Sequence, residues 1–213
     1  MNNSSLLISD PEKLTHINKP EYNIAVWRRT QQADNGLYCA LLASQPERIA
    51  IYCHYTSVAD SLQLSIQRSL SEYNISDAVN FFKDVQLLAD TFYQISGSKQ
   101  LKLYFSVVHN DMCRRFNTDI NDLRLLCTYW GAGTLWLNDH TISEQMLDAA
   151  MEQPEILTNH ICRAGTGDVV ILKGALHTTA RGNAVLHRSP AIEEHGNKRI
   201  LLRLDTNIMA WDY

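Results

Sequence analysis

Residues 101–137, LKLYFSVVHNDMCRRFNTDINDLRLLCTYWGAGTLWL, decide the fold of this chain. Apolar side chains at Leu101, Leu103, Phe105 and Val107 alternate with more polar ones, which is the two-residue repeat of a half-buried strand. Two more strands are predicted over 123–130 and 134–137, joined by a glycine-rich turn. The stretch therefore predicts three strands and two tight connections.

The segments on either side of this stretch differ in type. Before it, apolar residues at helical spacing predict amphipathic helices over 56–73 and 76–96. Segment 36–53 favours a helix followed by a strand, and 23–27 is a short buried segment of either type. After it, we expect strands over 169–172, 184–187 and 199–204, and a short helix over 142–152.

Helices followed by many short strands predict an α+β fold whose C-terminal part is a barrel or sandwich. At 213 residues and 45% hydrophobic, the chain suits one domain over 1–213. Within it we expect an irregular arm over 1–20, a mainly helical part over 21–97 and a β part over 98–213.

The amino-acid composition narrows the classes of molecule that this protein is expected to bind. The net charge is −4, and Lys and Arg form no basic run, which argues against nucleic acid and favours a small-molecule or protein substrate. Five cysteines without a C-x-x-C pair predict reduced thiols. We see no signal peptide or apolar run long enough to span a membrane, so a cytoplasmic location is expected. The oligomeric state stays open.

Two pairs with the same spacing suggest a metal site, His109-x-Asp111 and Asn117-x-Asp119. Side chains at i and i+2 of a strand point to the same face, so either pair could direct two ligands into one cavity. A histidine and a carboxylate on one strand, joined by a distant histidine, form the facial triad of non-haem Fe(II) oxygenases. The best distant candidate is His187.

Several motifs resemble a bacterial family of uncharacterised proteins, the domain-of-unknown-function 1826 family. They are Cys113-Arg-Arg-Phe-Asn-Thr-Asp119, the segment 124–137, His187-Arg-Ser-Pro190 and Arg199-Ile-Leu-Leu. The family pattern is Cys-x-x-Phe-His-x-Asp, and this chain has Asn117 in place of the histidine. The resemblance supplies a pattern and no reaction.

A more distant resemblance is to the 2-oxoglutarate-dependent oxygenases. Their order of strand, His-x-Asp, apolar strand, Gly-Asp turn, distal histidine and a basic residue about a dozen positions later matches Asn117, Asp119, Gly167-Asp168, His187 and Arg199. This resemblance implies a double-stranded β-helix of jelly-roll or cupin type, with the N-terminal helices packed on one of two facing sheets. It also implies Fe(II) bound by Asn117, Asp119 and His187, with Asp119 and His187 as the catalytic pair. Arg199 would bind 2-oxoglutarate.

Alternatives remain at each position. An amide oxygen is a weak ligand for Fe(II) or Zn(II), so Asn117 predicts a weakened site, and His109 with Asp111 is a rival pair. Arg203 lies on the same strand face as Arg199 and is a rival carboxylate binder. A non-catalytic small-molecule or metal-binding protein of metal homeostasis, with zinc as a possible metal, is the alternative function.

Overall fold

The computed structural model of this chain describes residues 5–29, 39, 43, 50–55, 79–138, 142–180 and 184–206. The predicted helix over 56–73 lies outside these residues, as does most of segment 36–53.

A large sheet of seven strands organises the described residues. Its order is β1-β2-β8-β5-β10-β4-β3. The strands are β1 (Ser5–Ile8), β2 (Ile24–Trp27), β3 (Ala50–Tyr55), β4 (Leu101–Val108), β5 (Leu123–Trp130), β8 (Val169–Lys173) and β10 (Arg199–Asp205). β1 pairs with β2 in parallel, and the other neighbours pair antiparallel. The four central strands β8, β5, β10 and β4 match the predicted strands to within one residue at each end.

A second sheet has three strands in the order β7-β6-β9. They are β6 (Leu135–Leu137), β7 (Ile161–Arg163) and β9 (His187–Arg188), all antiparallel. β7 was not predicted, and β9 is shorter than the predicted strand over 184–187. Each of these strands has only two or three residues, too few for a clear alternation in the sequence.

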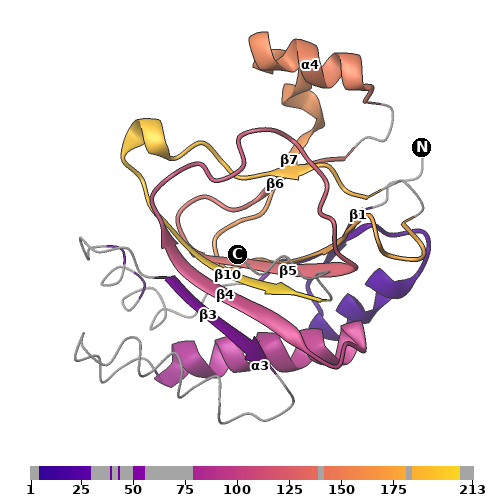
Figure 1. Cartoon of the computed structure of the whole chain (residues 1–213), viewed down its shortest axis with the longest axis vertical. Helices are drawn as coiled ribbons and strands as arrows, with labels where there is room; N and C mark the ends of the chain where they lie inside the picture. Colours follow the sequence, from indigo (N-terminus) through magenta and orange to yellow (C-terminus); the bar gives the residue numbers. More distant parts are fainter. Residues whose placement is uncertain are drawn as a thin grey trace.

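One face of the large sheet is covered by the helix α3 (Val79–Ser96), as Figure 1 shows. Phe81, Val85, Leu88 and Phe92 recur at helical spacing and are all buried in one cluster with the inward residues of β4, β5, β8 and β10. The predicted packing of the helix over 76–96 on one sheet is therefore confirmed for α3.

The opposite face of the large sheet meets the small sheet. Leu126, Val170 and Leu201 form a second buried cluster with Trp136 of the small sheet and Val185 just before it. Alternation along each strand explains both clusters, since neighbouring residues point to opposite faces. The protein thus combines a large sheet and few helices in three layers, with the two sheets facing each other. We call the space between the two sheets the inter-sheet layer.

The expectation of an irregular arm over 1–20 does not hold for residues 5–18. Ser5–Ile8 is a strand, and the 3₁₀ helix η1 (Pro11–Asn18) buries Leu14 and Ile17 completely. Asp10 caps η1 by accepting a hydrogen bond from the Glu12 amide, and Pro11 occupies the first helical position. The two prolines that suggested irregular chain instead bound a short helix. The segment 21–97 likewise contributes β2 and β3 to the large sheet, in addition to α3.

The remaining elements lie around the small sheet. They are α4 (Glu144–Glu152), which Ser143 caps, and the 3₁₀ helices η3 (Pro154–His160) and η4 (Glu193–His195). α4 falls inside the predicted helix 142–152. Among the helices that the structure describes, none has the length and apolarity needed to cross a membrane.

Candidate metal and anion site

Asn117 and His187 are brought together by the backbone. Each donates its amide to the other's carbonyl, at 3.0 Å from Asn117 and 2.9 Å from His187. They form an isolated antiparallel bridge, which extends the small sheet beyond β9. Directly opposed residues of such a pair project their side chains to the same face. The predicted convergence of these two positions is thus built into the backbone.

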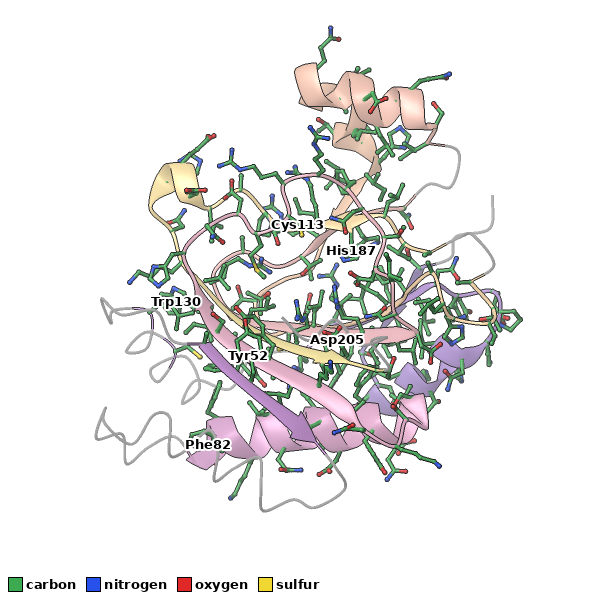
Figure 2. The ribbon with its side chains drawn as sticks, viewed as in Figure 1. Tyr52, Phe82, Cys113, Trp130, His187 and Asp205 are labelled. Carbon is green, nitrogen blue, oxygen red and sulfur yellow. The ribbon has the colours of Figure 1, made fainter. Side chains whose placement is uncertain are left out.

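The side chain of Asp119 lies beside that of His187. Its Oδ2 is 3.4 Å from His187 Nε2, and both side chains are about nine-tenths buried. His187 Nδ1 is 3.1 Å from the Val185 carbonyl, which suits a ring protonated at Nδ1. In that tautomer Nε2 presents a lone pair toward Asp119. Figure 2 shows His187 on the small-sheet side of the inter-sheet layer.

The second oxygen of Asp119 is already occupied. Oδ1 forms an ion pair with Arg124 Nη1, and Arg124 Nε is 2.5 Å from Asp205 Oδ1. Asp205 is almost fully buried and also accepts from Asn121 at 3.2 Å. A chain of charges therefore runs from β10 through Arg124 to Asp119 and fixes the carboxylate. Asp119 Oδ2, in contrast, is buried without a hydrogen bond among the described residues.

The loop that carries Asp119 is held in place by the turn after β8. The amide of Ala175 donates to the Asp119 carbonyl at 2.8 Å, and the Gly174 amide donates to Asp122 at 2.9 Å. A Cβ at Gly174 would lie 2.2 Å from the Asn121 carbonyl oxygen, so only glycine allows this close approach.

Arg199 is the second notable group of the inter-sheet layer. It is 1% exposed, and its Nη2 donates to Thr128 at 3.2 Å. Nε and Nη1 are buried and have no hydrogen-bond partner among the described residues. Burial lowers the pKa of Arg199 to about 10. A buried guanidinium without a counter-ion is costly unless an anion binds it.

The rivals named from the sequence have other partners. Arg203 forms an ion pair with Asp205 at 2.9 Å and lies over the Tyr104 ring, 5.0 Å from its centre. Asp111 accepts from the amides of Ile192 and Glu193 at 2.6 and 2.9 Å. These backbone hydrogen bonds, first that from Glu193, hold the pKa of Asp111 below its ordinary value. Asp111 therefore anchors the η4 turn. Because its carboxylate is occupied there, the His109-x-Asp111 pair has no carboxylate available for a metal.

The donor set fits a metal ion in part. His187 Nε2 and Asp119 Oδ2 are one imidazole nitrogen and one carboxylate oxygen with no stronger partner than each other. Asn117 donates its Nδ2 to the Arg115 carbonyl at 3.1 Å, which leaves the amide oxygen as its only possible ligand atom. Within the described residues, no three His, Cys, Asp or Glu side chains gather into a metal-binding cluster. The site thus offers two good ligands and one weak one.

The sequence reasoning missed Arg124, Asp205 and Thr128. Arg124 and Thr128 lie within the predicted strand 123–130, and Asp205 directly follows the predicted strand 199–204. All three lie on the face that points into the inter-sheet layer. A charged or hydroxyl side chain at an inward position of an apolar strand is the signal that could have identified them.

Comparison with known proteins gives the class of the chain. Residues 8–205 match the family described as protein of unknown function (DUF1826), so the chain belongs to that family. No curated protein matches its sequence.

Among solved structures, the dioxygenase for auxin oxidation 1 from Arabidopsis thaliana, in complex with 2-oxoglutarate, is similar at 10% identity and a TM-score of 0.50. The match covers 97% of this chain and 93% of that chain. A putative oxygenase from Shewanella oneidensis matches at 12% identity and a TM-score of 0.48, over 95% and 89% of the two chains. The fold of this chain is thus similar to that of the Arabidopsis dioxygenase.

Proposed function

We propose that this protein is a non-haem Fe(II)- and 2-oxoglutarate-dependent oxygenase-like protein whose metal site is weakened by Asn117. The observation that carries the proposal is Arg199, a buried guanidinium in the same inter-sheet layer as Asp119 and His187, two of whose nitrogens have no hydrogen-bond partner within the described part of the chain. An arginine in that state fits a carboxylate ligand, because the planar fork can form two parallel charge-assisted hydrogen bonds.

The strand order supports a double-stranded β-helix. From β4 onward, the chain passes back and forth between the two sheets. β4, β5, β8 and β10 lie in the large sheet, whereas Asn117, β6, β7 and β9 lie on the small-sheet side. Asn117 comes between β4 and β5, β6 and β7 come between β5 and β8, and β9 comes between β8 and β10. Four strands of the large sheet (β4, β5, β8 and β10) and four segments on the small-sheet side (Asn117, β6, β7 and β9) related in this way form a rolled structure, with the inter-sheet layer as its interior. This roll brings Asp119 and His187, 68 positions apart in the sequence, to one point.

Each residue then has a distinct role. His187 Nε2 and Asp119 Oδ2 hold the metal, the Asn117 amide oxygen is a weak third ligand, and Arg199 orients the 2-oxoglutarate carboxylate. Fe(II) with 2-oxoglutarate supplies the activation of O₂ for oxidation of a substrate. Arg124 keeps Asp119 in one orientation by occupying its Oδ1, so a single oxygen faces the metal.

Metal titrations test this assignment. We expect Asn117→His to bind Fe(II), added anaerobically, at least ~10-fold more tightly than wild type, because imidazole is the better ligand. Asn117→Gln, which keeps the amide, is the matched control and should show no gain. If Asn117→His binds no better than Asn117→Gln, position 117 is structural and not a ligand.

The same titrations separate the role of Arg199. Arg199→Ala should bind metal as wild type does but lose the tightening that 2-oxoglutarate gives. Loss of metal binding itself in Arg199→Ala, with no effect of 2-oxoglutarate on any variant, would refute the oxygenase assignment.

A non-catalytic metal-binding protein is the second candidate. The specific observation in its favour is that the oxygenase triad is incomplete, since Asn117 stands in the place of a histidine and the described residues hold no cluster of three His, Cys, Asp or Glu side chains. This candidate predicts Zn(II) binding that is indifferent to 2-oxoglutarate and no O₂ consumption in the presence of Fe(II) and 2-oxoglutarate.

A further inference from the structure

A pocket lies on the outer face of the small sheet, away from the inter-sheet layer. Its volume is about 850 Å³, a size that accommodates small organic ligands. Its walls come from α4 and η3, from the chain that leads to Asn117, and from the chain that follows His187. The residues that matter here are Arg114, Arg115, Phe116, Leu147, Leu157 and Arg188. α4 stands at the top of Figure 1, above the small sheet.

Strand alternation separates this pocket from the candidate metal site. Phe116 and Arg188 are the sequence neighbours of Asn117 and His187, and they lie opposite each other across the same bridge. Because consecutive residues point to opposite faces, Phe116 and Arg188 face outward while Asn117 and His187 face inward. The Arg188 guanidinium carbon is 5.0 Å from the centre of the Phe116 ring.

Arg188 is poorly neutralised. Its Nε is buried without a hydrogen-bond partner among the described residues, and Nη1 makes only a long 3.4 Å contact with the Arg114 carbonyl. Burial, and then the nearby charge of Arg163, lower the pKa of Arg188. Both effects disfavour a positive charge at this position unless an anion accompanies it.

The carboxylates of the pocket supply that anion only in part, since the charge of Asp111 raises the pKa of Arg188 by less than burial and Arg163 lower it. Asp111 is engaged by two backbone amides and by Arg114 at 3.0 Å. Asp148 and Glu194 are exposed to solvent. The half-buried Arg188 head group thus remains available, beside an apolar wall that includes Leu147, Leu157 and Phe116.

We propose that this pocket binds an organic anion with an apolar body, such as a medium-chain or aromatic carboxylate. The head group pairs with Arg188, and the body lies against α4, η3 and Phe116. Charge-assisted bonds to a guanidinium already held against a ring lose little side-chain entropy on binding.

Binding to the metal-free, full-length protein tests the site independently of the proposed function. The probes are decanoate, decanol and inorganic phosphate, and calorimetric titration measures the affinity of each. We expect decanoate to bind at least ~10-fold more tightly than decanol, which lacks the charge, and than phosphate, which lacks the apolar body. Equal affinity for decanoate and decanol, or for decanoate and phosphate, would overturn the assignment.

Variants locate the binding site. Arg188→Gln should lose the preference for decanoate over decanol, whereas Lys83→Gln should not. Lys83 lies exposed on α3, across the large sheet, and its substitution removes the same unit of charge. Ala150→Trp keeps every charge and fills the pocket, so it should weaken both decanoate and decanol. Thermal melting confirms that each variant is folded. A folded Arg188→Gln that keeps the wild-type preference contradicts the proposal.

Hydrogen exchange gives an independent readout. The amides of Asn117 and His187 form the bridge behind Phe116 and Arg188, so decanoate should slow their exchange. Decanoate binding without slower exchange at either amide would place the ligand outside this pocket.

Discussion

Buried polar groups on the two faces of the large sheet differ in how completely they are hydrogen-bonded. On the face covered by α3, Arg29 pairs with both oxygens of Asp84, at 2.5 and 2.8 Å, and donates from Nε to the Gly167 carbonyl at 2.6 Å. Tyr129 also donates to Asp84, at 2.6 Å. On the face that meets the small sheet, Arg199 and Asp119 each keep buried atoms that form no hydrogen bond with any residue the structure describes.

This difference distinguishes a structural network from a candidate ligand site. A buried ion pair with all its bonds made serves the folded chain alone, and removing one partner is costly. Buried groups left unpaired in the folded chain are expensive to keep, and a ligand that pairs with them explains their presence. The comparison predicts that substitution of a paired group, such as Asp84, destabilises the fold, whereas substitution of Arg199 does not.

The largest effect is expected on the face covered by α3. Asp84→Ala leaves the Arg29 guanidinium without its carboxylate, and the free energy of unfolding should fall by about 3–5 kcal/mol. Urea denaturation measures this loss. Asp90→Ala, at an exposed position of the same helix, is the control and should stay within about 0.5 kcal/mol of wild type. A loss below about 1 kcal/mol for Asp84→Ala would show that the network contributes little.

An intermediate effect is expected for Arg124→Met on the other face. Asp205 keeps Asn121 and Arg203 as partners, but Asp119 keeps only His187. We therefore expect a loss of about 1–3 kcal/mol in the free energy of unfolding. Metal affinity should fall as well, because the orientation of Asp119 is no longer fixed. Unchanged metal affinity in a folded Arg124→Met protein would exclude a positioning role for Arg124.

Arg199→Met should act in the opposite direction. Without ligand, removing an unpaired buried charge should leave the free energy of unfolding unchanged or raise it by about 1 kcal/mol, despite the lost bond to Thr128. The same urea titration measures it, now with and without 2-oxoglutarate. A loss above about 2 kcal/mol in the absence of ligand would mean that Arg199 is a structural residue like Arg29.

How far the sequence predicts the fold depends on the length of each element. The alternation over 101–107 and the helical spacing over 76–96 are long enough to be unambiguous, and β4 and α3 follow them closely. β1 has only four residues, and it pairs in parallel with β2, whose residues lie 19 positions further along the chain (Ser5 opposite Ile24). Local patterns do not encode such a pairing. The 3₁₀ helix η1 could not be predicted from local sequence, because it depends on the burial of Leu14 and Ile17 against the rest of the fold.

The candidate site was predictable for a different reason. Asn117, Asp119 and His187 were named because of a resemblance and a two-residue spacing, and the backbone bridge between Asn117 and His187 now accounts for their proximity. The unpaired state of Arg199 was not predictable, since it depends on which strands surround it. The same holds for the ion pair of Arg124 with Asp119, which joins a loop to a strand.

The smallest effect concerns Lys173, at the edge of the face that α3 and η1 cover. Its Nζ donates to the Lys19 carbonyl at 2.7 Å, and burial lowers the pKa of Lys173 from 10.5 to about 8. Between pH 8 and 10.5 the unfolded chain therefore binds this proton more strongly than the folded protein does. Linkage then requires the free energy of unfolding to rise with pH across that window.

Lys173→Met removes this titration, so the wild type should gain stability relative to the variant from pH 8 to 10.5. The amine keeps its hydrogen bond to Lys19 in both protonation states, and a difference of one bound proton gives a gain on the order of 1 kcal/mol per pH unit within this window. Urea titrations at several pH values measure the difference in free energy of unfolding between the two proteins. Other groups that titrate in the same range contribute equally to both proteins, so their effect cancels. Parallel pH curves for the two proteins would mean that Lys173 titrates normally. The lysine would then reach solvent, and this edge of the sheet would not be sealed by η1.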